Sequence, residues 1–305
     1  MPRASRCNAG RAASRSNTRM TANLPLPSLF VSHGSPMMAL EPGAAGAFLQ
    51  RLGPAIDAAF GRPRAILGLS AHSLARAPML LAAERHAAVY DFGGFDPRLH
   101  TLRYDAPGAP ALAVRVEALL ARAGIRAQRV DEGGIDHGLW TPLRYAWPDA
   151  DVPVLPLAWL PSQTPAEQFA LGQALASLAD EGVLVLGTGS MTHNLGRVFG
   201  GGRMVAVDQP EIAESAAFRG WFAERSAERD WAALLAYRIR APHAVDMHPT
   251  DEHLLPWFIA AGAGGSDSAA QRLHDSVTHG ALGMDAYAFG PSAARLADAL
   301  RPRVD

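Results

Sequence analysis

Lysine is absent from this sequence, and all 28 basic residues are arginine. A chain without lysine cannot form a lysine Schiff base, bind pyridoxal phosphate through a lysine, or build a P-loop. Cysteine is nearly absent as well, since Cys7 is the only one. Disulfides within the chain and cysteine-based zinc sites are therefore excluded.

An excess of charge of one sign is also lacking, because 28 arginines stand against 29 acidic residues. No basic surface therefore argues for a nucleic-acid partner. No apolar run approaches the roughly 20 residues of a membrane span, so we expect no membrane partner and predict a cytoplasmic location. The 305 residues, 49% of them hydrophobic, suffice for one large α/β domain or two small ones.

The first nineteen residues are rich in arginine, serine and alanine and contain no acid. They lack the apolar centre of a secretory signal, although a transit peptide has a similar composition. A disordered extension, or an upstream start codon with Met20 as the natural start, explains them better. We therefore expect a disordered extension over residues 1–22 and one catalytic domain over residues 23–305.

Short apolar runs that predict buried strands alternate with helical patterns along the chain. The predicted strands are Ser28–Ser32, Ala65–Ser70, Met79–Ala83, Val152–Leu157, Val183–Gly187 and Met284–Phe289. The predicted helices are Ala111–Ala123, a segment from a capping box at Thr164 to about Asp180, Pro210–Glu228 and Ser292–Leu300. Glycine-rich pieces near Gly200–Gly202 and Gly262–Gly265 are predicted to be surface loops. This alternation favours a single-domain, three-layer α/β/α sandwich around a mostly parallel or mixed sheet.

Histidines follow three of these predicted strands. His33 ends the first strand, His72 follows the second, and His193 follows the strand Val183–Gly187. In an open α/β sheet, the carboxyl ends of parallel strands face a common crevice in which ligands bind. If the strands are parallel, the three imidazoles converge as the ligands of a mononuclear iron or zinc site do. One histidine at a strand end is more commonly a hydrogen-bonded loop residue, whereas three at strand ends favour a metal site.

Two further histidines lie in segments that suit a site. His137 lies in a turn-rich segment, and His253 is predicted to fall in the first turn of a helix capped by Thr250. That helix start would bring His253 to the cluster, and the role of His248 stays open because it is so near. The other histidines lie in polar or irregular stretches and are predicted to be surface residues: His86, His100, His243, His274 and His279.

Seven short motifs occur in order over roughly Pro27 to Gly290. They are SHGSP, SAH, VYDFGGF, YDAPGAP, DHGLW, a His-Asn pair after a Gly-Ser turn, and HPTDEHLLP. Together they resemble the class III extradiol ring-cleavage dioxygenases, in the DOPA 4,5-dioxygenase branch that is related to the catalytic subunit of protocatechuate 4,5-dioxygenase. Seven motifs in the right order are far more specific than any one of them.

The resemblance implies that His33, His72 and His253 are metal ligands. It implies that His193 is an acid/base residue beside the metal, or a fourth ligand when zinc is bound, and that His137 contacts the substrate. Fe(II) is the cofactor expected for activity, and zinc can occupy the site after purification.

Two positions depart from the family pattern, and a third leaves a choice within it. His248 stands where relatives often have another polar residue, so it is not counted as a ligand. Tyr90 stands where relatives often have histidine before Asp-Phe-Gly-Gly-Phe. The protocatechuate branch completes its ligand set with glutamate, so the third ligand can be either His253 or its neighbour Glu252. The family motif favours His253, with Glu252 orienting its ring.

The implied reaction opens the ring of a catechol with O₂ and yields a muconic semialdehyde. Three protein ligands leave positions on the metal for two catechol oxygens and O₂. Phe92, Phe95 and Trp140 either wall the aromatic ring or pack in the core. A zinc-dependent hydrolase could use the same three histidines, and a non-catalytic metal-binding protein could share the scaffold. DOPA, caffeate, protocatechuate or another catechol fits the resemblance.

Overall fold

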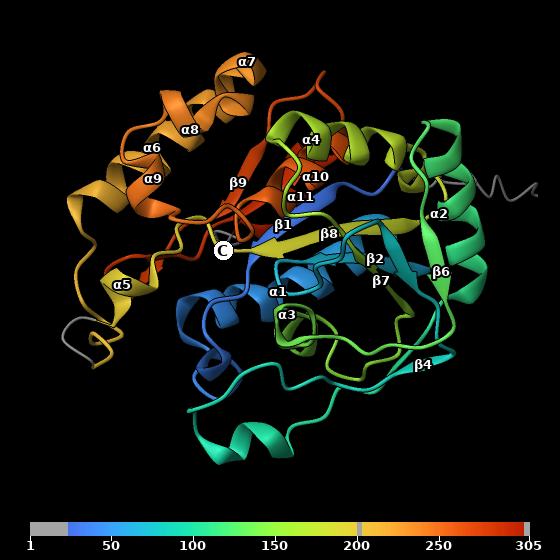
Figure 1. The fold of residues 1–305 in the computed structure, drawn as a ribbon, viewed down its shortest axis with the longest axis horizontal. Coiled ribbons are helices and arrows are strands. Elements are labelled where there is room, and N and C mark those ends of the chain that lie inside the picture. The colour runs from blue at the N-terminus through green and yellow to red at the C-terminus, as the bar shows by residue number, and fades with distance from the viewer. Residues whose placement is uncertain (1–23, 200–202, 302–305) are drawn as a thin grey trace, which may run out of the picture.

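A mixed eight-stranded sheet lies at the centre of the computed structural model, which describes residues 24–199 and 203–301 (Figure 1). From edge to edge the strand order is β6-β3-β7-β2-β8-β1-β12-β9. The strands are β1 (Ser28–Ser32), β2 (Ala65–Ser70), β3 (Met79–Leu81), β6 (Gln128–Val130), β7 (Val154–Ala158), β8 (Val183–Gly189), β9 (Gln271–His274) and β12 (Ala286–Phe289). Two small ladders pair β4 (Arg85–His86) with β5 (Ala106–Pro107) and β10 (Val277–Thr278) with β11 (Leu282–Gly283).

The neighbouring strands β7, β2, β8 and β1 run parallel to one another. Phe30 of β1 lies opposite Gly187 of β8, and Val185 of β8 lies opposite Leu67 of β2. Antiparallel pairs flank them, β3 beside β7 and β12 beside β1. The carboxyl ends of β2, β8 and β1 therefore meet at one edge of the sheet.

Helices cover both faces of the sheet (Figure 1). One face carries α1 (Gly43–Phe60), α3 (His137–Ala146) and α11 (Ala293–Leu300), and the other carries α2 (Pro110–Arg122), α4 (Pro165–Ala174) and α10 (Leu255–Gly264). Successive side chains of β1 point to opposite layers, since Leu29 and Val31 belong to one apolar cluster and Phe30 to the other. The predicted α/β/α sandwich is confirmed.

Shorter elements complete the described chain. They are α5 (Leu195–Val198), α6 (Ala213–Glu228), α7 (Trp231–Leu235), α8 (Tyr237–Arg240), α9 (Ala244–Met247) and 3-10 turns at Pro36–Ala39, Pro97–Thr101 and Ala176–Ala179. In Figure 1, α6 to α9 lie together on one side of the sheet. Among the described residues, no helix combines the length and the apolar character that crossing a membrane requires.

Most predicted elements are present, with shifted ends. The capping box forms as predicted, because the Thr164 hydroxyl accepts from the amide of Glu167 and the Glu167 carboxylate accepts from the amide of Thr164. That helix ends at Ala174 and is followed by a 3-10 turn, so its predicted end near Asp180 is wrong. The long helix α1 was not predicted. The expected extension over residues 1–22 and the glycine-rich piece at residues 200–202 lie outside the described residues.

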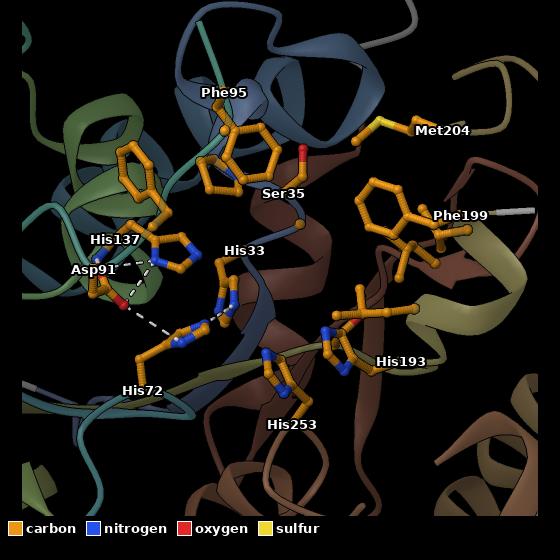
Figure 2. Close-up of a pocket in the computed structure, with 18 of the residues that line it drawn as sticks. His33, Ser35, His72, Asp91, Phe95, His137, His193, Phe199, Met204 and His253 are labelled. Carbon is orange, nitrogen blue, oxygen red and sulfur yellow. Dashed lines mark hydrogen bonds and ion pairs between the residues drawn. The ribbon is translucent and has the colours of Figure 1, made fainter. Parts of the chain in front are cut away.

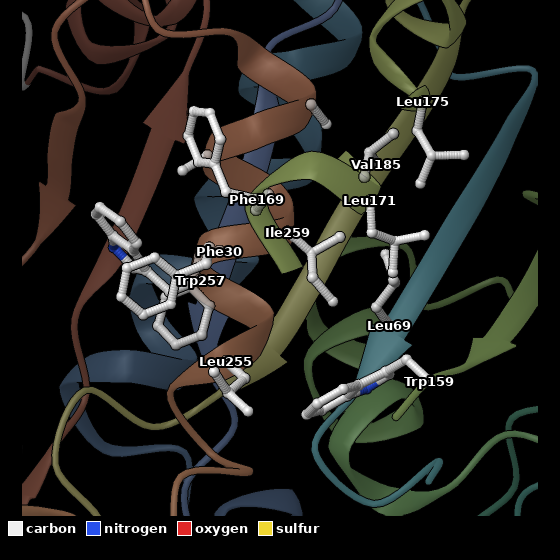
Figure 3. Close-up of a cluster of buried hydrophobic side chains, with 14 of the residues drawn as sticks. Phe30, Leu69, Trp159, Phe169, Leu171, Leu175, Val185, Leu255, Trp257 and Ile259 are labelled. Atoms are coloured by element: carbon white, nitrogen blue, oxygen red, sulfur yellow. The ribbon is translucent and has the colours of Figure 1, made fainter. Parts of the chain in front are cut away.

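The predicted surface loop at Gly262–Gly265 is wrong, because residues 262–264 belong to α10. Helices α10 and α4 approach so closely that a Cβ at Gly262 would lie 2.0 Å from the carbonyl oxygen of Phe169. A Cβ at Gly172 would likewise lie 2.0 Å from the carbonyl oxygen of Ile259. Figure 3 shows Phe169 of α4 and Ile259 of α10 in the same apolar cluster. These glycines permit a helix contact in the core.

We predict that Gly262→Ala lowers the free energy of unfolding by about 2 kcal/mol, because its methyl group overlaps backbone atoms that cannot move independently. Gly220→Ala is the matched control, since Gly220 lies in α6 with no atom within 4 Å of its Cβ position. That control should be neutral or slightly stabilising, and urea unfolding monitored by circular dichroism measures both. Equal stability of the two variants would contradict the close contact.

Candidate metal centre

Histidines that follow three neighbouring parallel strands lie around one cavity (Figure 2). His33 comes directly after β1, and its amide donates to the carbonyl oxygen of Gly189 at the end of β8 over 3.0 Å. His72 follows β2, and its amide donates to the hydroxyl of Ser70 over 3.1 Å. His193 follows β8. The structure thus brings together the three side chains that were predicted to converge from their places at the ends of parallel strands.

His253 reaches the cavity from a turn that precedes a helix. Helix α10 begins at Leu255, whose amide donates to the carbonyl oxygen of Asp251. Thr250 does not cap this helix, because its hydroxyl donates to the carboxylate of Glu252 over 3.0 Å. The predicted N-cap is therefore wrong, although His253 still reaches the cluster.

Two glycines of β8 allow this turn to approach the sheet. A Cβ at Gly189 would lie 1.9 Å from the carbonyl oxygen of His253, and a Cβ at Gly187 would lie 2.4 Å from that of Pro256. The amide of Ser190 donates to the same His253 carbonyl oxygen over 2.9 Å. Strand β8 therefore positions the backbone of His253 directly.

His137 is the first residue of α3 and enters the cavity beside the strand ends. Its ring centroid lies 4.2 Å from that of His72 and 5.4 Å from that of His33. Gly138 leaves the space that this approach needs, because a Cβ there would lie 2.4 Å from the Ser70 hydroxyl oxygen and 3.1 Å from Cε1 of His33. The segment that was predicted to be turn-rich is thus the start of a helix.

The five rings form a continuous cluster. The Nε2 atoms of His33 and His72 lie 3.1 Å apart. The ring centroid of His253 lies 5.4 Å from that of His33 and 5.0 Å from that of His72. His193 stacks on His253, with centroids 3.5 Å apart and planes inclined by 7°.

These residues fit a divalent metal ion. Their donor atoms form two groups, each within 4.8 Å: His33, His72 and His137, and His193, Glu252 and His253. The Nε2 atoms of His33 and His72 lie 3.1 Å apart. Two nitrogens that each lie about 2.1 Å from the same metal ion can be this close to each other. Imidazole nitrogens with a nearby carboxylate are the donors that Fe(II) and Zn(II) bind. The sequence and the structure therefore agree on a metal site here.

Burial favours the neutral imidazole at His33, His72, His193 and His253. Desolvation is the largest cause that lowers the pKa of His33, His72 and His253, and neighbouring histidines lower it further. Burial lowers the pKa of His193 to about 4, although the charge of Glu252 opposes the shift. A neutral imidazole keeps the lone pair that a metal ligand or a proton acceptor needs.

Asp91 links two of these histidines, and it was not among the predicted site residues. Its carboxylate lies 3.0 Å from Nδ1 of His137, accepts from the His137 amide over 3.0 Å, and lies 3.5 Å from Nδ1 of His72. Burial opposes ionisation of this carboxyl, but the hydrogen bonds from His137 outweigh it and hold the pKa of Asp91 below its ordinary value. With Nδ1 held by Asp91, the ring of His137 presents Nε2 to the cavity. The sequence feature that could have identified Asp91 is its position within the VYDFGGF motif.

The cavity has a volume of about 640 Å³, and its outer part is apolar (Figure 2). Phe92 and Phe95 line it, with centroids 6.0 Å apart and planes inclined by 86°. Trp140 instead lies in the core, where its Nε1–H donates to the carbonyl oxygen of Val89 over 3.0 Å. The facing wall was not predicted, and it consists of Leu195, Val198, Phe199 and Met204.

His248 lies outside the cavity, behind His193. It is fully buried, and its Nε2 lies 2.9 Å from the carbonyl oxygen of Met191. Burial lowers the pKa of His248 to about 3, which keeps the ring neutral. The question that the sequence left open is answered in favour of a structural position.

Two other histidines are also buried, so their predicted surface positions are wrong. His86 and His279 each place Nδ1 against a backbone carbonyl oxygen, over 3.2 Å and 2.7 Å. His274 is half-buried and stacks on an aromatic ring. His100 and His243 are exposed, as predicted. An imidazole can be buried when it donates a hydrogen bond to a backbone carbonyl group inside the protein. Sequence context does not show which carbonyl groups lie within reach, so these buried positions were not predicted.

Known proteins resemble this chain over most of its length. The family model for the catalytic LigB subunit of aromatic ring-opening dioxygenase matches residues 27–290. A protein named 4,5-DOPA dioxygenase extradiol from Beta vulgaris is 36% identical over 267 residues, which are 85% of this chain and 95% of that protein. The Escherichia coli K12 protein of the same name is 39% identical over 180 residues, 59% of this chain and 62% of that protein.

The fold is shared with a solved structure. A crystal structure of an uncharacterized Escherichia coli K12 protein superposes with a TM-score of 0.69 at 28% identity, covering 87% of this chain and 100% of that one. Sequence motifs, histidine cluster and fold thus agree. The chain belongs to the LigB family of aromatic ring-opening dioxygenases and is an extradiol dioxygenase of the DOPA dioxygenase-like branch.

Proposed function

We propose that the protein opens the ring of a catechol, DOPA-like or another, beside its two hydroxyl groups. Both atoms of O₂ enter the product, a muconic semialdehyde. The convergence of five histidines on one cavity of about 640 Å³ carries this proposal. Relatives named 4,5-DOPA dioxygenase extradiol support the choice of substrate class.

The catalytic domain is proposed to span residues 23–305. The family match over residues 27–290 supports these bounds. A cytoplasmic location stays a prediction.

His33, His72 and His253 are proposed to hold the metal, with Fe(II) in the active protein and Zn(II) able to replace it. His33 and His72 face each other through Nε2, and the ring of His253 adjoins both. The carboxylate of Glu252 lies 3.2 Å from Nδ1 of His253, where it can orient the ring and leave Nε2 free. This contact supports His253, and not Glu252, as the third ligand. When bound, Fe(II) supplies the centre at which catechol and O₂ meet and lowers the catechol pKa.

His193 is proposed to accept a proton from a catechol hydroxyl and to return it as the O–O bond breaks. Its ring lines the cavity, stacks on His253, and is neutral because burial lowers its pKa to about 4. A neutral imidazole with an accessible nitrogen can accept and then return a proton. The same contact with His253 supports a second role for His193 as a fourth ligand of zinc.

His137 is proposed to position the substrate. Asp91 holds its Nδ1, so its Nε2 can accept a hydrogen bond from a substrate hydroxyl. The ring of Phe92 lies edge-on to that of His137, with centroids 5.5 Å apart. Phe92 and Phe95 can therefore hold the catechol ring while the histidines contact its oxygens.

We predict that anaerobic loading with Fe(II) gives a protein that consumes O₂ and a catechol in equal amounts and forms a yellow semialdehyde. An oxygen electrode and absorbance spectra measure both. Zinc loading is the control and should give no O₂ uptake. Absence of turnover with several catechols, while Fe(II) is shown to be bound, would contradict the proposal.

We predict that His193→Gln retains iron but lowers kcat by about 10²- to 10⁴-fold, the usual contribution of a general acid/base. His253→Gln should lose most of the iron, and His137→Gln should retain it while KM for the catechol rises. Iron content is measured by inductively coupled plasma mass spectrometry. If His193→Gln lost iron in proportion to activity, His193 would be a ligand first; if His137→Gln lost it, the ligand set would need revision.

We predict that the metal-free protein loses stability as the pH falls from about 7.5 to 5.5. A buried histidine with a lowered pKa takes up its proton only on unfolding, so below its ordinary pKa of about 6.5 the unfolded state binds more protons. For His248, whose folded pKa is about 3, the loss at pH 5.5 is on the order of 1 kcal/mol. Urea unfolding at both pH values measures it.

Two variants test the source of that pH dependence. His248→Asn should reduce it by the amount expected for one histidine. His100→Asn is the control on an exposed histidine and should leave it unchanged. An identical pH dependence in His248→Asn and the parent protein would show that His248 does not contribute.

A further inference from the structure

The two ends of the cavity differ in chemistry (Figure 2). The histidine cluster and Asp91 lie at one end, and Phe95, Phe199 and Met204 lie at the other. A catechol whose hydroxyl groups face the histidines directs its ring substituent toward these apolar side chains. The outer end therefore decides which substituents are accepted.

Basic side chains are missing from this outer end. No arginine lines the cavity among residues 24–199 and 203–301, and the chain contains no lysine. The residues between Phe199 and Arg203 are glycines in the sequence and bring no charge. Arg197 of the adjoining helix α5 is held by Asp246, at 2.6 Å. A substrate carboxylate would thus find no described cationic partner on the cavity wall.

A second cavity of about 400 Å³ adjoins the first, since both are lined by Gly34, Ser35 and Met204. Apolar side chains line much of it, among them Met37, Met38, Val277 and Met284.

The charged side chains of this second cavity are carboxylates. Glu41 and Asp208 line it and are exposed. His279 also lines it, with Nδ1 placed 2.7 Å from the carbonyl oxygen of Val205. A long substituent that passes Met204 would therefore meet thioethers, methyl groups and carboxylates.

We propose that this site selects catechols whose ring substituent carries no carboxylate group. The inference rests on the proposed catechol cleavage and narrows its substrate class. An anionic substituent would leave water for an apolar wall without a cationic partner, which costs free energy. If it is long enough to pass Met204, it would also approach Glu41 and Asp208, whose charges have the same sign. An apolar substituent meets neither penalty, and an ammonium group, which also loses water, is attracted to the carboxylates of Glu41 and Asp208.

Two substrate pairs that differ in a carboxylate test this selection with the Fe(II)-loaded protein. The first pair is dopamine and DOPA, and the second is para-propylcatechol and dihydrocaffeate. We expect kcat/KM to be about tenfold or more higher for the carboxylate-free member of each pair. Equal values, or a preference for the carboxylates, would overturn the proposal. A lack of turnover of all four catechols would instead refute the proposed function.

Substitutions at Met204 test whether the wall causes the preference. Met204 lines both cavities and is 37% exposed, so a longer polar side chain can be accommodated. Met204→Arg supplies the missing cation and should shift the ratio of kcat/KM toward dihydrocaffeate by about tenfold. Met204→Leu is the uncharged control and should keep the parent preference. An unchanged ratio in Met204→Arg would show that this wall does not set the selection.

Arg203 provides the opposing test, because it is exposed and precedes Met204 in the chain. Under our proposal, Arg203→Gln leaves the ratio between dihydrocaffeate and para-propylcatechol unchanged. If the parent protein prefers dihydrocaffeate and Arg203→Gln removes that preference, then Arg203 binds the carboxylate and the proposal is wrong.

Discussion

The parallel pairing of β1, β8 and β2 is the constraint on which the rest of the site depends. Its hydrogen bonds continue past the strand ends, where the amide of His33 donates to the carbonyl oxygen of Gly189 and the amide of Ala71 donates to that of Thr188. These bonds hold the first loop residues in the register of the sheet. Imidazoles from segments far apart in sequence consequently lie within a few ångströms. Fixed positions matter because ligand and proton-transfer geometry tolerate little error.

The site also requires that backbone segments approach one another closely, and glycine residues permit this approach. Gly187 and Gly189 let the turn of His253 lie directly on β8, and Gly138 leaves room for the ring of His33. A methyl group at any of these positions would overlap other atoms of the site. The short glycine-containing motifs of this chain are therefore packing requirements of the histidine cluster as well as turns.

The histidines of the site differ in their burial and in the carboxylates that contact them. Burial lowers the pKa of His33, His72, His193 and His253 and favours their neutral form. Carboxylates contact Nδ1 of His137 and Nδ1 of His253. These contacts select the tautomer that presents Nε2 to the cavity. The apolar wall at the other end has no comparable polar partners. One cavity thus combines a site for metal and protons with a separate surface that discriminates between substituents.

The sequence by itself determined the sandwich, the strand ends that carry His33, His72 and His193, and the family, because apolar periodicity and short motifs are local. It did not reveal that Gly262 contacts α4, that Trp140 packs in the core, or that Asp91 joins His137 to His72. Each of these depends on contacts between segments distant in the chain, which residue type does not encode. The apolar wall of Phe199 and Met204 was likewise decided by the tertiary structure, because it exists only where α5 and the residues after it meet the strand ends.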